Sequence, residues 1–143
     1  MKYSSIVTKR VMAAVRGAFI ADAASMGTHW IYSPKEMAET VSDISKPEFR
    51  DPPAPRYYSS EDFDGHYRFG MLSPYGEQML FVTEHLAEGD VNGEAMSKAM
   101  LEWATSFGGR PDSALKQFTE NMQKDEGQWP NCGADDDQGS YNS

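Results

Sequence analysis

The sequence predicts an all-α protein. Apolar residues recur three and four positions apart in several long segments, which is the spacing of one face of a helix. Serine–proline and glycine signals mark where these segments begin and end, and no segment alternates as a strand does. A chain of 143 residues is long enough for one domain with its own core.

The first expected helix spans residues 7–27, with Gly27 as its stop. One face carries the following residues: Val11, Met12, Val15, Phe19, Asp22 and Met26. A carboxylate on a packed face needs hydrogen-bond donors, a cation or a proton. Asp22 therefore either bridges to a neighbouring helix through hydrogen bonds or borders a polar cleft between helices.

A short helix is expected next, from Pro34 to Val41. Residues 42–70 then form a long connection rich in proline and aromatic residues. Connections of this length inside a compact domain are usually functional or disordered. The many aromatic side chains favour an ordered wrap over a free linker.

Three more helices are expected after this connection. Ser73 and Pro74 form an N-cap and a first turn, a further helix covers residues 92–107, and Pro111 opens the last. Their apolar stripes are, in order: Tyr75, Met79, Val82 and Leu86; Met96, Met100, Trp103 and Phe107; Leu115, Phe118 and Met122. Residues 124–143 form an acidic, polar tail.

Composition narrows the classes of partner. The chain has 22 acidic and 13 basic side chains and a net charge of -9. Such a chain has no general attraction for nucleic acid or anionic lipid, and no apolar run is long enough to span a membrane. The single cysteine, Cys132, makes no internal disulfide. We therefore expect a cytoplasmic protein that binds neither nucleic acid nor membrane.

Four short stretches, taken in order, resemble one family. They are Gly17-Ala-x-x-Ala-Asp-Ala23 with Gly27 and His29-Trp30; Pro47-Glu-Phe49; Leu72-Ser-Pro-Tyr-Gly-Glu-Gln78; and Gly133-Ala-Asp-Asp-Asp-Gln138. Together they are similar to the ADP-ribosylglycohydrolase superfamily, and more closely to its branch of J-type crystallins and selenoprotein J. The resemblance implies a compact bundle of many α-helices, of which residues 1–143 form the N-terminal part.

The resemblance also implies an activity and a site. Enzymes of this family remove ADP-ribose from protein side chains or related acceptors, generally with two magnesium ions held by oxygen ligands. The site residues it implies are Asp22 and Glu77 as catalytic groups, His29, Tyr75 and Gln78 as substrate-binding groups, and Glu77, Asp135 and Asp136 as metal ligands. Four of them also have a plainer alternative: Glu77 as charge at a helix N-terminus, His29 as a packed side chain, and Asp135 and Asp136 as part of a solvated acidic run.

The chain departs from the family pattern in two places. The Thr-Asp-Asp-Thr metal motif falls on Pro74, Tyr75, Gly76 and Glu77, so both aspartates are absent. The C-terminal Asp-x-Asp-Thr group is absent as well, which predicts a fragment or half-domain able to self-associate through exposed helix faces. Two functions follow as alternatives: a hydrolase of glycosidic bonds to ADP-ribose or a related nucleotide sugar, and a non-catalytic, crystallin-like structural or ligand-binding protein.

Overall fold

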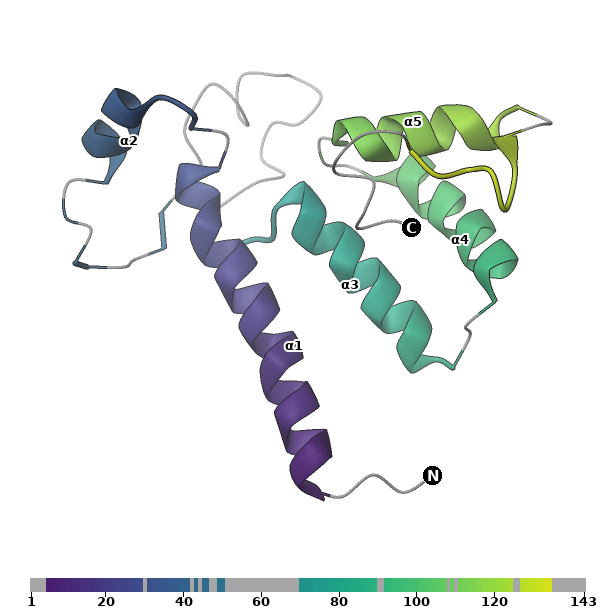
Figure 1. Ribbon diagram of the computed structural model, residues 1–143, viewed down its shortest axis with the longest axis horizontal. Helices are drawn as coiled ribbons and strands as arrows, with labels where there is room; N and C mark the ends of the chain where they lie inside the picture. The colour runs from purple at the N-terminus through teal and green to yellow at the C-terminus, as the bar shows by residue number, and fades with distance from the viewer. Residues whose placement is uncertain are drawn as a thin grey trace. The chain divides into compact units, whose positions relative to one another are not determined.

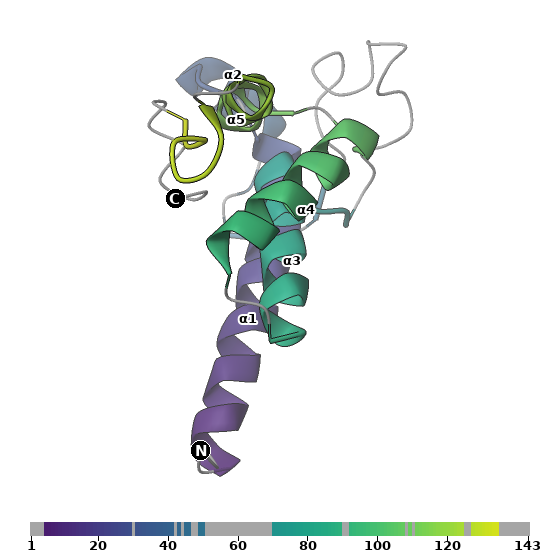
Figure 2. The same cartoon turned by 90° about the vertical axis from the view of Figure 1, so that its right-hand side faces the viewer.

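The computed structural model is helical, as Figures 1 and 2 show. The residues that it describes are 5–29, 31–41, 43, 45, 46, 49, 50, 70–89, 92–107, 109, 111–124 and 127–134. Over these ranges it contains α-helices and one short 3-10 helix and no strand, which confirms the all-α prediction. The chain divides into two compact units, Met1–Gly76 and Glu77–Ser143, and each is described by itself.

The first unit contains α1 (Ser5–Ser25), the 3-10 helix η1 (Met26–Thr28) and α2 (Pro34–Thr40). The predicted helix 7–27 thus exists, but its last turn tightens into η1. The short helix predicted from Pro34 to Val41 is also present. The Ser33 side chain accepts a hydrogen bond from the Glu36 N–H, and Pro34 occupies the first turn, where its missing N–H costs nothing.

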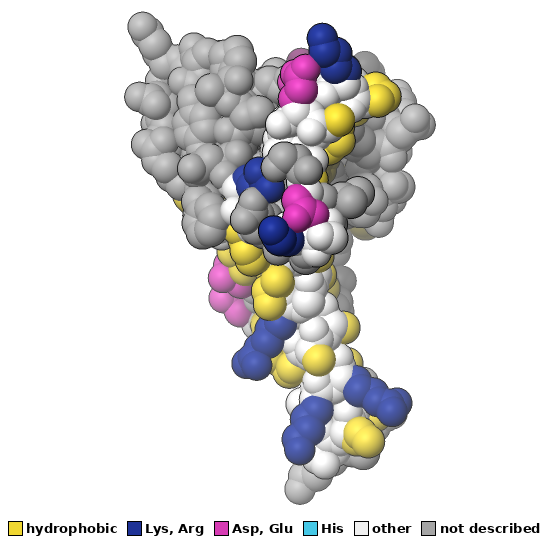
Figure 3. Space-filling model, turned by 90° about the vertical axis from the view of Figure 1, so that its left-hand side faces the viewer, with side chains coloured by type: hydrophobic (Ala, Val, Ile, Leu, Met, Phe, Trp, Pro, Cys, Tyr) yellow, Lys and Arg dark blue, Asp and Glu magenta, His cyan; other side chains and the backbone are white. Residues whose placement is uncertain are grey.

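The apolar face of α1 is covered only toward its C-terminal end. Met26 is fully buried and Val15 and Phe19 are half-buried, whereas Val11 and Met12 are 55% and 46% exposed. The prediction that Val11 and Met12 are packed is therefore wrong for this chain. In Figure 1, α2, the other α-helix that lies wholly within the first unit, is at the C-terminal end of α1 and not along its N-terminal turns. Figure 3 shows yellow apolar side chains along α1, with dark blue basic ones between them.

The second unit contains most of α3 (Pro74–Ala87), together with α4 (Gly93–Ser106) and α5 (Ser113–Met122). All three were predicted. Asn92 caps α4 by accepting a hydrogen bond from the Ala95 N–H. The start of α5 lies two residues later than predicted, because Asp112, not Pro111, positions its first turn. Leu86 was expected on the packed stripe of α3 but is 47% exposed.

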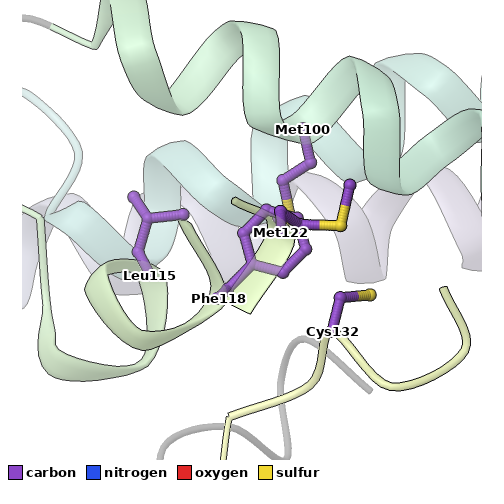
Figure 4. Packing of buried hydrophobic residues seen from close by; sticks show 5 residues of the cluster. All are labelled: Met100, Leu115, Phe118, Met122 and Cys132. Atoms are coloured by element: carbon purple, nitrogen blue, oxygen red, sulfur yellow. The ribbon is translucent and has the colours of Figure 1, made fainter. Parts of the chain in front are cut away.

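A small apolar core holds the second unit together (Figure 4). Its buried members are Met100 from α4, Leu115, Phe118 and Met122 from α5, and Cys132 from the segment after α5. Phe81 and Val82 of α3 pack against this cluster, and the Phe81 ring stacks on Trp103 at 5.3 Å between centroids. The predicted inward residues of α5 are confirmed, since all three are buried.

Leu115 is 1% exposed, so its removal tests this core. We expect Leu115→Ala to lower the unfolding free energy of the second unit by about 3 kcal/mol, the usual cost of a cavity where a buried leucine was. Urea unfolding followed by far-ultraviolet circular dichroism measures it. The exposed neighbour Lys116 is the matched control, and Lys116→Ala should change stability by less than about 0.5 kcal/mol. Equal effects of the two variants would contradict the assignment of this core.

Candidate functional site

The carboxylate of Asp22 is bound to the residue that begins α3. The Ser73 backbone N–H donates to Asp22 Oδ2 at 2.7 Å, and the Ser73 hydroxyl donates to Asp22 Oδ1 at 2.5 Å. Ser73 is fully buried and Asp22 is half-buried. Both carboxylate oxygens therefore have donors, which removes the cost of placing this charge on an apolar helix face. The sequence left two alternatives for Asp22, a hydrogen-bonded bridge to a neighbouring helix or the border of a polar cleft. The observed hydrogen bonds have the geometry of the bridge.

Ser73 also caps the helix that it precedes. Its Oγ accepts a hydrogen bond from the Gly76 N–H at 3.2 Å, which satisfies one of the free N–H groups at the helix start. Pro74 follows in the first turn, as predicted. The hydroxyl thus donates to Asp22 and accepts from Gly76 at the same time, so one buried serine joins α1 to the first turn of α3.

Gly76 is the residue that lets the carboxylate come this close. A Cβ built on Gly76 would overlap Asp22 Oδ2, and would meet the Leu72 side chain at 3.0 Å. Only glycine fits beside the Asp22–Ser73 pair. Gly76 stands where the family motif has an aspartate. At this position the backbone lies close to Asp22, and there is no side-chain oxygen that could bind a metal ion.

His29 and Tyr75, two of the predicted substrate-binding residues, lie together in the first unit. Their ring centroids are 5.3 Å apart and the rings are tilted by 54°. Burial lowers the pKa of His29 below its usual 6.5, while the nearby charge of Asp22 opposes this shift. The structure thus brings Asp22, His29 and Tyr75 to one place, and their predicted roles toward a substrate remain predictions.

Gln78, the third predicted substrate-binding residue, takes part in a buried contact of the second unit. It is 5% exposed, and its side-chain amide donates to Asp112 Oδ2 at 2.6 Å. The other Asp112 oxygen accepts from the Leu115 N–H at 2.7 Å and caps α5. Sequence reasoning missed Asp112, although an aspartate directly before a helical apolar pattern is an N-cap signal.

The described residues contain no cluster of metal-ligating side chains. Glu77 is half-buried in the first turn of α3, in the position that suits an acid near the helix N-terminus. Asp22 is held by two hydrogen bonds from Ser73, and no group of three or more His, Cys, Asp or Glu side chains gathers within the described ranges. Asp135 and Asp136, the other predicted ligands, lie outside the described residues, as does most of the predicted connection 42–70.

The stretch of sequence that contains these helices and the Asp22–Ser73 bridge matches one known family. The sequence profile of the ADP-ribosylglycohydrolase family matches residues 4–141, almost the whole chain, and the chain belongs to this family. The match begins at α1 and covers all the described helices, so the Asp22–Ser73 bridge lies inside the family domain.

Two relatives are crystallins of Tripedalia cystophora. The chain is 32% identical to crystallin J1B over 130 residues and 32% identical to crystallin J1A over 124 residues. These alignments cover 90% and 85% of this chain, but the chain spans only 37% and 35% of the two relatives. No solved structure matches it significantly. Among the described helices, none has both the length and the apolarity needed to cross a membrane.

A double-mutant cycle on Asp22 and Ser73 tests the bridge. We expect Asp22→Ala to cost about 2–4 kcal/mol, because it leaves buried donors without an acceptor. Ser73→Ala should cost about 1–2 kcal/mol as a lost cap, and the double variant should cost about 1 kcal/mol less than the sum. Thermal or urea unfolding measures all three. Ser25→Ala is the control, since its exposed hydroxyl bonds only to a backbone carbonyl of the same helix. Full additivity would contradict the bridge.

The lowered pKa of His29 predicts a pH dependence. The folded chain holds His29 neutral where the unfolded chain begins to protonate it, so this contribution to stability is fully present above about pH 6.5 and is lost as the pH falls below it. Urea midpoints compared between about pH 7.5 and pH 5.5 should therefore fall less in His29→Gln than in the unaltered chain. Parallel pH profiles for the two proteins would show that His29 is not buried in this way.

Proposed function

We propose that the chain is a non-catalytic, crystallin-like member of the ADP-ribosylglycohydrolase family, in which the polar start of α3 serves stability. The observation that carries this proposal is the Asp22 carboxylate, whose two oxygens both accept hydrogen bonds from Ser73 and beside which Gly76 leaves no room for a side chain. Each oxygen of this carboxylate already accepts a hydrogen bond from the protein, so its geometry is that of a group that joins two helix ends.

Further support comes from the composition and from the relatives. The relatives that share the greater part of this chain are named crystallins. A net charge of -9 favours solubility at high protein concentration, because like-charged molecules repel one another. A single, buried cysteine suits a reducing compartment, and we infer a cytoplasmic location on that basis.

A second candidate function is a hydrolase of glycosidic bonds to ADP-ribose or a related nucleotide sugar. The family match supports it, as does the meeting of Asp22, His29 and Tyr75 in the first unit. In that function Asp22 and Glu77 would act on the substrate, with His29 and Tyr75 against its ring or ribose. The magnesium ions that such an enzyme generally uses would need ligands beyond the described residues.

Ligand binding separates the two functions. We expect no binding of ADP-ribose at about 1 mM, the weak end of specific affinity, with magnesium present and by isothermal titration calorimetry. We also expect no release of ADP-ribose from a modified protein substrate. A catalytically active ADP-ribosylglycohydrolase serves as the positive control. Binding that is lost in Glu77→Gln but retained in the exposed-site variant Glu84→Gln would overturn the proposal and favour the hydrolase.

A further inference from the structure

The segment after α5 is attached to both α4 and α5 within the second unit. It comprises residues 127–134, drawn in yellow in Figure 1, and we call it the strap. The Asn121 side-chain amide of α5 donates to the Gly133 carbonyl of the strap at 2.9 Å. The neighbouring residue Cys132 is 5% exposed and belongs to the core cluster with Met100 of α4 and Met122 of α5 (Figure 4). The strap therefore supplies one side chain to the core between these helices.

The other anchor of the strap is Trp129, whose indole lies against Gly93 in the first turn of α4. A Cβ built on Gly93 would be 2.5 Å from both Cζ2 and Cη2 of Trp129, closer than real Cβ atoms come to any neighbour. Gly93 is inside a helix, where glycine is less favourable than alanine. The glycine thus costs helix stability and provides the space that the indole occupies.

The two anchors belong to one short turn. The Asn131 N–H donates to the Gln128 carbonyl at 2.7 Å, which closes a turn around Trp129, and Cys132 follows directly. This hydrogen bond lies inside the strap and does not depend on either helix. Because Trp129 and Cys132 are only three positions apart on a chain shaped in this way, release of one anchor loosens the other.

The helices beneath the strap have packing of their own. Leu115 and Phe118 of α5 are buried with Met100 of α4, and Phe81 and Val82 of α3 pack against this cluster. These contacts remain when Cys132 and Trp129 leave. Segments with few buried apolar contacts open at a lower free energy than the core that they cover. Opening of the strap is therefore separable from unfolding of the helices.

We propose that the strap is a conformational latch, which opens as a unit while α3, α4 and α5 stay folded. The contact of Trp129 with Gly93 sets how often it opens. Cys132 is the single cysteine of the chain, so the latch controls access to its one thiol. A thiol reacts only where reagents reach it, and Cys132 therefore reacts in the open state and is protected in the closed one. This device operates whether or not the family chemistry is retained.

Alkylation of the full chain by iodoacetamide, followed by mass spectrometry, measures the open state, because the chain contains no second thiol. In the unaltered chain we expect a labelling rate that changes little at low urea concentrations, since a local opening exposes little surface. Trp129→Ala should raise this rate about tenfold or more, because an aromatic anchor is lost. Circular dichroism should show that the helices remain.

Gly93→Ala separates contact with the indole from helix propensity. Propensity alone predicts a more stable α4 and no faster labelling, whereas the latch predicts a rate close to that of Trp129→Ala, because the added Cβ displaces the indole. In the Trp129→Ala background, Gly93→Ala should then change the rate by less than about twofold. Gly133→Ala is the matched control within the strap, since its added Cβ would meet nothing within 4 Å and should leave the rate unchanged.

Three results would overturn the proposal. The first is a labelling rate in the unaltered chain that rises with urea in proportion to global unfolding, or that already equals the rate of the unfolded chain. The second is a rate in Trp129→Ala equal to that of the unaltered chain, a result that Trp129→Ala gives even where Gly93→Ala does not fold. The third is slower labelling in Gly93→Ala, the outcome expected from helix propensity alone.

Discussion

The hydrogen bonds between Asp22 and Ser73 are the interaction on which the first unit depends. They join residues 51 positions apart and connect α1 to the residues that begin α3. The same serine hydroxyl caps α3 by accepting a hydrogen bond from the Gly76 N–H. One side chain therefore both orients the start of α3 and supplies a donor to the carboxylate. Gly76 allows the close approach, and Ala23, buried one residue after the aspartate, keeps the surface beside it small. Loss of the Asp22 side chain would leave the donors of Ser73 without their acceptor, and loss of the Ser73 hydroxyl would leave the Gly76 N–H without its cap.

This use of the carboxylate bears directly on function. In the family that the chain belongs to, the resemblance places metal-binding aspartates at the start of the helix that here begins with Pro74, and this chain has Tyr75 and Gly76 in their place. In the pair of residues that remains, Ser73 donates a hydrogen bond to each oxygen of Asp22. Gln78 and Asp112 repeat the pattern in the second unit, where a buried amide and a buried carboxylate tie α3 to the cap of α5. In both units, polar residues that the sequence offers as candidates for chemistry are engaged in holding helices.

Local signals were sufficient to predict most of the fold. The helices, the Ser73–Pro74 start and the buried residues of α5 all follow from spacing and capping over a few residues, although the start of α5, the last turn of α1 and the exposure of Leu86 differ. The site was less predictable, because what decides the role of Asp22 is a donor far away in the sequence. Periodicity likewise shows which face of α1 is apolar but not whether anything covers it. Val11 and Met12 were therefore wrongly predicted to be packed. The predicted metal ligands Asp135 and Asp136 lie outside the described residues and stay predictions.

We propose that the Asp22 carboxylate serves the fold and is not available to a ligand. Hydrogen–deuterium exchange at the Ser73 and Gly76 backbone amides tests this most directly, because those N–H groups donate to Asp22 and to the Ser73 hydroxyl. We expect strong protection of both amides that does not change when ADP-ribose and magnesium are added. Exchange at the rate of an open loop, or protection at Ser73 that falls on adding the ligand and the metal, would contradict it.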